Sequence, residues 1–372
     1  MKVISDILTK YFDLQHPTSI LMVDRAFIAL YAIFTLLSKN NTKKKVLFTS
    51  NTCASPVYAS IYAGLTPIFS DITLDNYLMD LDETSKLIEK YKDELVAVVY
   101  IYTFGHTSAD IKLIQKLTRK YGIALIEDVA QAFGSYVDDQ KTGTIGDLSV
   151  FSFGYSKHID AGCGGFLINN NPYKYDAIEL HNIIENIKHS KSNTEISNSY
   201  KKEYYKNRLL VLENDNNYKL FENFHIEYKS MYFKKLNPDW QDVEEKLYNF
   251  IQSNEHIERN DRAKRYYDGL TIPALNHRIY APIVKRGYSV YRYSILVSEL
   301  KISEHLCQYL RSNSINCSNL YLPVSRYFNK SKYIRSVTFS KRVINLWVDS
   351  MATDEYIKHT LNTVYRYFNE NK

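Results

Sequence analysis

Two short segments carry the residue types best suited to covalent chemistry. In "LIEDVAQAFGS", Asp128 ends an apolar run and Gln131 comes three residues later. In "FSFGYSKHIDAGCGG", Ser152 and Lys157 lie five residues apart, before a pair of glycines. A lysine amine in a turn, together with a carboxylate at another strand end, suits a nucleophile and its charged partner. We therefore take Lys157 as the candidate nucleophile.

One cofactor uses this combination of groups. Pyridoxal phosphate needs a lysine amine for a Schiff base and a carboxylate that keeps its pyridine nitrogen protonated. Its phosphate needs hydroxyls and backbone amides, often at a helix N-terminus. Lys157, Asp128 and Ser152 supply the amine, the carboxylate and a hydroxyl. The lysine would also move a proton as a general acid and base.

The same residues have ordinary structural interpretations. Most lysines are solvated, Asp128 would serve as a helix N-cap, and Ser152 needs no special reason to be polar. Cys53 fits a small buried apolar residue better than a reactive thiol, and His158 fits a structural or a solvent-facing role. The combination, in register along the chain, favours chemistry over these separate interpretations.

The elements that must position these residues follow from an alternation of apolar runs and helical stretches. Six runs are predicted strands: 46–50, 67–72, 95–102, 123–128, 148–153 and 165–170. Four stretches are predicted helices: 25–38, 54–63, 82–92 and 109–121. The near-continuous apolarity predicts strands covered on both faces, in a mostly parallel sheet of a doubly wound α/β domain. Such sheets bind ligands at the carboxyl ends of their strands, where Asp128 and Ser152 fall.

The pattern weakens after this region. Residues 172–236 are predicted to be an irregular or inserted segment, with a possible hairpin in "LFENFHIEYKSMYF". A long helix is predicted from Asp239 to Leu270, with Pro238 near its start. The remainder predicts a smaller C-terminal α+β domain. We place the two domains at residues 1–238 and 239–372.

Length, charge and cysteine content limit the classes of protein to which this chain can belong. The 372 residues suffice for two domains with a sizeable core. The net charge of +6 is spread along the chain, and its longest basic run, Lys43 to Lys45, does not predict a nucleic-acid surface. The N-terminus lacks the apolar core of a signal peptide, and no run approaches the roughly 20 residues of a membrane span. The four cysteines show no metal-ligand spacing and indicate a reduced, cytoplasmic protein without a metal site.

These motifs resemble the nucleotide-sugar aminotransferases of the DegT/StrS group, which are fold-type I pyridoxal-phosphate enzymes. The likeness lies in Asp-x-Ala-Gln at 128–131, Ser-Phe-x-x-x-Lys at 152–157 and the following Gly-Gly turn. It continues upstream in "ASIYAGLTPIFSDI" and "YIYTFGHTSADI" and downstream in "YLRSNSINCSNLYLPVSRYF". The resemblance implies a fold-type I large domain followed by a small domain, and a homodimer with its sites at the subunit interface.

The resemblance also implies a role for each matched residue. Lys157 would form the Schiff base, and Asp128 would pair with the pyridinium nitrogen. Gln131 would lie near the 3-hydroxyl of the cofactor, and Ser152 would bind its phosphate. Glu127, beside the aspartate, is also usual in this group.

Three positions depart from the group's pattern. Where a Ser-Gly-Thr or Ser-Gly-Arg turn usually cradles the phosphate, this chain has Asp24-Arg25-Ala26, and Arg25 is the candidate phosphate ligand there. Thr52 matches the group, but Cys53 stands where relatives carry an aromatic residue that stacks on the cofactor ring. In this group one residue reaches across the dimer to the cofactor phosphate bound by the partner subunit. Asn207, Arg208 and Lys229 are the candidates for that residue here, and the choice among them stays open.

The function that the resemblance implies is amino transfer to a nucleotide-linked keto-sugar, with glutamate as donor, in surface-polysaccharide synthesis. Two alternatives stay open. One is a pyridoxal-phosphate enzyme that acts on a non-nucleotide ketone or catalyses another reaction, such as dehydration. The other is a weakened relative with a regulatory or binding role, although retention of both Asp128 and Lys157 counts against it.

Overall fold

A seven-stranded sheet forms the centre of the larger domain in the computed structural model, which describes residues 1–14, 20–39, 41–191, 194–328 and 333–370. The strands are β1 (Ile20–Val23), β2 (Lys45–Thr49), β3 (Thr66–Ser70), β4 (Leu95–Ile101), β5 (Ala124–Asp128), β8 (Leu148–Ser152) and β9 (Gly165–Asn169). Their order is β1-β9-β8-β5-β4-β2-β3. Strands β2, β3, β4, β5 and β8 run parallel, whereas β9 runs antiparallel to both of its neighbours. The predicted α/β fold is confirmed, and the short strand β1 is an addition to the six predicted strands.

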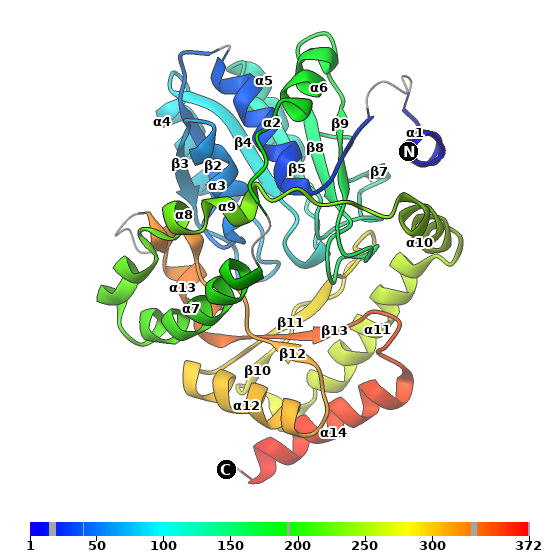
Figure 1. Ribbon diagram of the computed structural model, residues 1–372. Helices are drawn as coiled ribbons and strands as arrows, with labels where there is room; N and C mark the ends of the chain where they lie inside the picture. The colour runs from blue at the N-terminus through cyan, green and yellow to red at the C-terminus, as the bar shows by residue number, and fades with distance from the viewer. Residues whose placement is uncertain (15–19, 40, 192–193, 329–332, 371–372) are drawn as a thin grey trace.

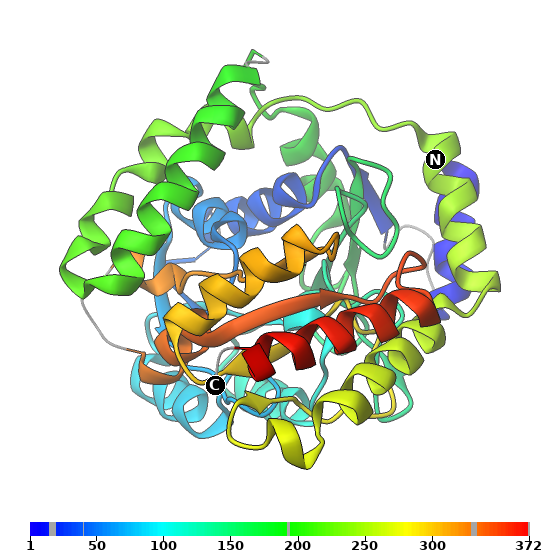
Figure 2. The ribbon, with the colours of Figure 1, turned by 90° about the horizontal axis from the view of Figure 1, so that it is seen from below.

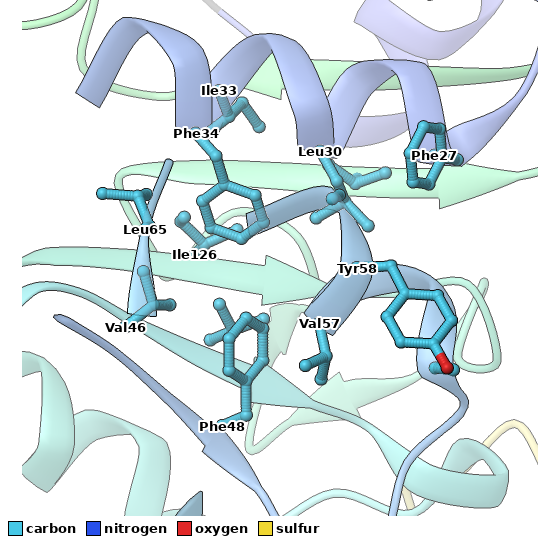
Figure 3. Close-up of a cluster of buried hydrophobic side chains, with 14 of the residues drawn as sticks. Phe27, Leu30, Ile33, Phe34, Val46, Phe48, Val57, Tyr58, Leu65 and Ile126 are labelled. Carbon is cyan, nitrogen blue, oxygen red and sulfur yellow. The ribbon is translucent and has the colours of Figure 1, made fainter. Parts of the chain in front are cut away.

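Helices cover both faces of this sheet (Figure 1). Helices α2 (Ala26–Lys39) and α3 (Ala54–Tyr62) pack on one face, as Figure 3 shows for Phe34 of α2 above Val46 and Phe48 of β2. Helices α1 (Lys2–Phe12), α4 (Leu81–Tyr91) and α5 (Asp110–Lys120) share the other core cluster with Leu47. Successive strand residues therefore point to opposite buried faces, which explains why the strands are apolar at nearly every position.

The irregular structure predicted for residues 172–236 was wrong, because much of the segment is helical. The alternative that the segment is an insertion stays a prediction. The segment contains α6 (Ala177–Glu185), α7 (Thr194–Glu213), the 3₁₀ turn η3 (Asp215–Phe221), α8 (Phe224–Glu227) and α9 (Lys229–Tyr232). The expected hairpin is absent from the described residues there, since η3, α8 and α9 occupy its place. Its aromatic residues recur every three or four positions, at Phe221, Phe224, Tyr228 and Tyr232, and all four side chains are buried. That spacing places them on one side of a helical path rather than on alternate faces of a strand.

The predicted long helix from Asp239 to Leu270 is two helices. Helix α10 (Trp240–Gln252) begins at Asp239, whose carboxylate accepts the amides of Gln241 and Asp242. Helix α11 (Glu255–Leu270) begins after Asn254, which has a φ of 52°. Asparagine tolerates this left-handed conformation better than most residues, so the chain turns there without a glycine.

The smaller domain is built on a four-stranded antiparallel sheet in the order β10-β11-β13-β12. Its elements are β10 (Ile279–Tyr280), β11 (Arg292–Val297), α12 (Leu300–Ser312), β12 (Cys317–Ser318), α13 (Ile334–Arg342), β13 (Val343–Trp347) and α14 (Asp354–Glu370). Figure 1 shows this sheet below the large one, and Figure 2 views the molecule from that side. The boundary between residues 238 and 239 stays a prediction. Among the described residues, no helix combines the length and apolarity that crossing a membrane requires.

A buried carboxylate fixes the small domain to the large one. Asp71, just after β3, accepts the amides of Arg335 and Ser336 at the start of α13, both at 2.9 Å, and the Ser336 hydroxyl at 2.7 Å. A carboxylate at a helix N-terminus satisfies its free amides and its positive dipole end. The two domains are therefore held together on the side where the parallel strands end.

Candidate active site

Asp128 and Ser152 leave the large sheet at one edge. Strands β5 and β8 are parallel neighbours, and Asp128 pairs in register with Val150, two residues before Ser152. The structure therefore brings both strand ends together, as expected for ligand-binding residues of an open α/β sheet. The Ser152 hydroxyl accepts the amide of Gly154 at 3.2 Å and keeps its own proton for donation.

Asp128 is a buried carboxylate with one oxygen committed to the protein. Its Oδ1 accepts the amide of Ala130 at 3.0 Å, and 6% of the residue is exposed. Burial raises the pKa of Asp128, while the Ala130 amide and the positive charge of Lys157 oppose that rise. The lysine charge thus stabilises the ionised form of the aspartate. The predicted roles of Asp128 at the ring nitrogen and of Lys157 at the aldehyde stay predictions.

The turn that carries Lys157 is built by Asp160. The carboxylate of Asp160 accepts the amide of Ser156 at 2.7 Å and that of Gly162 at 3.0 Å, across the whole turn. Ser156 has a φ of 62°, and the amide of Lys157 donates to the carbonyl of Gly154 at 3.1 Å. A turn fixed at both ends holds the half-buried lysine at the site rather than in solvent.

Aromatic residues of the small domain face Lys157. Its Nζ lies 5.3 Å from the ring centre of Tyr291, and the guanidinium of Arg292 lies 4.5 Å from the same ring. Nε2 of the neighbouring His158 donates to the carbonyl of Ser289 at 2.9 Å. Since a carbonyl only accepts, Nε2 carries the proton. Burial, with nearby Arg259 adding to it, lowers the pKa of His158 well below its usual range, which suits the structural role predicted for it.

Gln131 connects the large domain to Tyr321. Its Oε1 accepts the amide of Phe104 at 2.9 Å, and its Nε2 donates to the Tyr321 hydroxyl at 2.9 Å. The predicted contact of Gln131 with the cofactor's 3-hydroxyl stays a prediction. Tyr291 and Tyr321 were not predicted as site residues. They are two of 33 tyrosines. Tyr321 lies in the segment 309–328 that carries part of the family resemblance, but no role was predicted for it.

Thr52 and Cys53 precede α3 beside the same charges. Thr52 is 5% exposed. Burial raises the pKa of the Cys53 thiol; the charge of Asp128 adds to this rise and that of Lys157 opposes it. Cys53 therefore lies within electrostatic range of Asp128 and Lys157, with a side chain too small to cover an aromatic ring.

The turn at Asp24 and Arg25 contacts the chain itself. Arg25 Nη1 donates to the carbonyls of Met231 at 2.7 Å and Tyr232 at 3.1 Å. Asp24 Oδ2 accepts the amide of Leu236 at 2.9 Å. Arg25 thus holds the end of α9, and Asp24 holds the chain a few residues beyond it. Phosphate binding by Arg25 stays a prediction that these contacts do not support.

Arg208 and Lys229, two of the three residues left open for contact with a partner subunit, have contacts within the chain. Arg208 Nη1 pairs with Glu304 at 2.8 Å, and its Nη2 donates to the carbonyl of Asn319 at 2.7 Å. Lys229 Nζ lies 5.2 Å from the ring centre of Tyr62. Arg208 therefore joins α7 to the small domain.

Glu127 organises the loop next to the site. Its carboxylate accepts the Tyr102 hydroxyl at 2.6 Å and the amides of Gly143, Ile145 and Gly146 at 2.8, 2.7 and 2.6 Å. Gly146 has no room for a larger residue, because an added Cβ would lie 2.7 Å from the carbonyl of Leu125. Four donors on a fully buried carboxylate make Glu127 a structural support for β5 and its loop.

Changing Glu127 to Gln is expected to lower the free energy of unfolding by about 2–4 kcal/mol, because an amide nitrogen cannot accept the hydrogen bonds made to one carboxylate oxygen. Urea unfolding followed by circular dichroism measures the change. Glu185→Gln, at an exposed position of α6, is the matched control and should change stability little. Equal stability of the Glu127 variant and the control would contradict this role.

These residues fit pyridoxal phosphate at its ring and aldehyde end. Asp128 Oδ2 has no hydrogen-bond partner within the described part of the chain and suits a protonated ring nitrogen, and the half-buried Lys157 amine suits the aldehyde. The Ser152 hydroxyl suits the phosphate. Within the described ranges there is no group of three or more metal-ligating side chains.

Comparison with known proteins agrees with this chemistry. Residues 23–220 match the DegT/DnrJ/EryC1/StrS aminotransferase family. The chain is 30% identical over 167 residues to a GDP-perosamine synthase of Escherichia coli O157:H7, covering 45% of this chain and 44% of that protein. It is also 30% identical over 181 residues to a UDP-4-amino-4,6-dideoxy-N-acetyl-beta-L-altrosamine transaminase of Campylobacter jejuni, covering 48% and 46%. The matches thus span less than half the length of these relatives.

Solved structures share the fold over the whole chain. The aminotransferase TlmJ from Streptoalloteichus hindustanus has a TM-score of 0.75 at 19% identity, covering 100% of this chain and 91% of that one. The PLP-form of the putative sugar aminotransferase Spr1654 from Streptococcus pneumoniae has a TM-score of 0.73 at 17% identity, with coverage of 100% and 91%. At these identities the likeness establishes the architecture of both domains together, the fold-type I arrangement expected from the sequence.

Proposed function

Since the chain belongs to the DegT/DnrJ/EryC1/StrS aminotransferase family, we propose that it is a pyridoxal-phosphate-dependent aminotransferase acting on a nucleotide-linked keto-sugar. The observation that carries this proposal is the pairing of a buried carboxylate, Asp128, with the Lys157 amine at neighbouring strand ends. The names of the relatives, a GDP-sugar synthase and a UDP-sugar transaminase, support a nucleotide-linked sugar as acceptor.

The chain's own residues would divide the work as follows. Pyridoxal phosphate supplies an aldehyde that takes up the amino group and a protonated ring that withdraws electrons from the neighbouring carbon. Asp128 would hold the proton at the ring nitrogen through its ionised carboxylate. Lys157 would bind the aldehyde carbon and, once the incoming amine frees it, would move a proton as general base and general acid. Ser152 would donate its hydroxyl proton to the phosphate.

Glutamate is the proposed amino donor, and the protein is proposed to act in the cytoplasm as a homodimer. Donor and acceptor enter in separate half-reactions, so each is testable alone. Incubation of the loaded enzyme with glutamate should release 2-oxoglutarate in an amount equal to the enzyme, detected by mass spectrometry. A panel of GDP-, UDP- and dTDP-linked keto-sugars should then identify the acceptor by a gain of an amino group in place of the keto oxygen.

Two outcomes favour the alternatives. An enzyme that binds pyridoxal phosphate but releases no keto acid from any amino acid would be a non-transaminating relative. A protein that binds no pyridoxal phosphate would be a weakened relative with another role, an outcome that the contacts of Asp24 and Arg25 with the chain itself make worth testing.

A further inference from the structure

The turn after β2 lies against the small domain at the site. The amide of Ser325 donates to the carbonyl of Ser50 at 3.4 Å, and the Asp71 contacts with α13 fix the same region. This turn ends at Cys53, which begins α3 without a side-chain cap. A flat aromatic cofactor gains much of its binding energy from the side chains on its faces, and a cysteine offers little surface for this. Cover on this side must therefore come from another element.

Tyr321 of the small domain is held in a fixed position beside this turn. Its hydroxyl accepts the Nε2–H of Gln131 at 2.9 Å, and the Gln131 amide is itself oriented by the Phe104 amide on its Oε1. The ring of Tyr321 packs on that of Phe104, with centroids 6.2 Å apart and planes 17° from parallel. The carbonyl of Tyr321 accepts the Ser340 hydroxyl at 2.5 Å. Ring, hydroxyl and backbone are thus each constrained, by three different elements.

Tyr321 lies within electrostatic range of Cys53. Burial raises the pKa of the Tyr321 hydroxyl, and negative charge on Tyr291 or Cys53 would raise it further, so these groups lie within electrostatic range of one another. Cys53 is in turn within range of Asp128 and Lys157. The hydrogen bond between Tyr321 and Gln131, three residues after Asp128, places the large ring of the small domain on the same side of the site as the small side chain of Cys53.

We propose that Tyr321 contacts the cofactor and covers the ring of pyridoxal phosphate on the side where Cys53 leaves space. The inference rests on the proposed function, since it assumes an aromatic cofactor between Asp128 and Lys157. It makes cofactor binding depend on the docking of the small domain through Gln131. The small residue at position 53 and the aromatic residue at position 321 are then a matched pair.

The test is the dissociation constant of pyridoxal phosphate, measured by equilibrium dialysis of the full-length protein. Tyr321→Ala should weaken binding about 10- to 100-fold, the range for loss of one aromatic stacking partner. Tyr321→Phe keeps the ring and should weaken binding less than about tenfold. Cys53→Phe alone should also weaken binding, because two rings then compete for one space. The double variant Cys53→Phe/Tyr321→Ala should recover binding to within about threefold of the wild type.

Thermal unfolding of each cofactor-free variant establishes that it folds, and Tyr321→Leu replaces Tyr321→Ala if the alanine variant does not. Wild-type affinity in Tyr321→Ala would overturn the proposal, as would a folded double variant that binds no better than Tyr321→Ala. A wild-type protein that does not bind pyridoxal phosphate would overturn the proposed function as well. A loss confined to the Tyr321 variants and corrected by Phe at position 53 would establish the contact.

Discussion

Replacing Lys157 with alanine is expected to abolish covalent capture of pyridoxal phosphate and to lower amino transfer at least about 1,000-fold. The amine is both the nucleophile for the aldehyde and the group that moves the proton, and removal of a general acid–base alone costs about 10²–10⁴-fold. Asp160 fixes the turn that carries Lys157, and the positive charge of Lys157 opposes the rise in the pKa of Asp128 that burial causes. These two observations are compatible with both proposed roles.

Borohydride treatment detects covalent capture of pyridoxal phosphate independently of amino transfer. The lysine amine condenses with the aldehyde with loss of water, and borohydride reduces the resulting carbon–nitrogen double bond to a stable amine. Peptide mass spectrometry should then find the phosphopyridoxyl group on Lys157 of the wild-type protein. Lys157→Arg is the matched control for charge, because it keeps a cation near Asp128 but offers no free amine. Lys116→Ala, on the exposed face of α5, controls for loss of a surface lysine. Label on another lysine of the wild-type protein would contradict the assignment.

The core of the large domain was predictable because burial on both faces marks its strands. Every residue of β4 is buried, so its sequence does not alternate between apolar and polar residues as it would in a strand with one face in solvent. The parallel order then follows from the alternation with helices, and it brings the ends of β5 and β8 together. Asp128 and Lys157 were predicted as site residues from their strand ends and from the family resemblance, without knowledge of any long-range contact.

The helices after β9 were not predicted because the segment is polar and its few apolar residues were not recognised as having a helical spacing. Helix α7 exposes most of its surface, and its buried positions include Asn207 and Arg208, which are polar. Arg208 is satisfied by Glu304 and the carbonyl of Asn319, contacts about 100 residues away. A sequence pattern contains no information on such partners, so the helix resembles a solvated loop.

The small-domain residues of the site were unpredictable for a related reason. Tyr321 reaches Gln131 across 190 residues, and the bond depends on how one sheet docks against the other. That docking is set by Asp71 at the N-terminus of α13 and by the stacking of Tyr321 on Phe104. Neither contact repeats along the chain, and tyrosine is too frequent here for its presence to mark a site.

Replacing Asp128 with asparagine is expected to have opposite effects on function and stability. Amino transfer should fall about 10²–10³-fold, the range for removal of one preorganised electrostatic partner, because a neutral amide no longer holds a proton on the ring nitrogen. The cofactor-free protein should become more stable at neutral pH. Asparagine keeps the Oδ1 acceptor for the Ala130 amide but removes a buried negative charge whose burial cost the Ala130 amide and Lys157 offset in part.

The stability gained by Asp128→Asn should depend on pH. Burial raises the pKa of Asp128 in the folded protein above its unfolded value, so the folded state binds that proton more tightly. The stability that this group contributes is present below its unfolded pKa and is lost as the pH rises through its folded pKa. Asparagine does not titrate, so its advantage over the wild type should grow as the pH rises from about 4 toward 7. Urea unfolding at several pH values measures it, with Asp261→Asn on the exposed face of α11 as control. A pH-independent difference would contradict the buried charge, and full amino transfer by Asp128→Asn would contradict its role at the ring nitrogen.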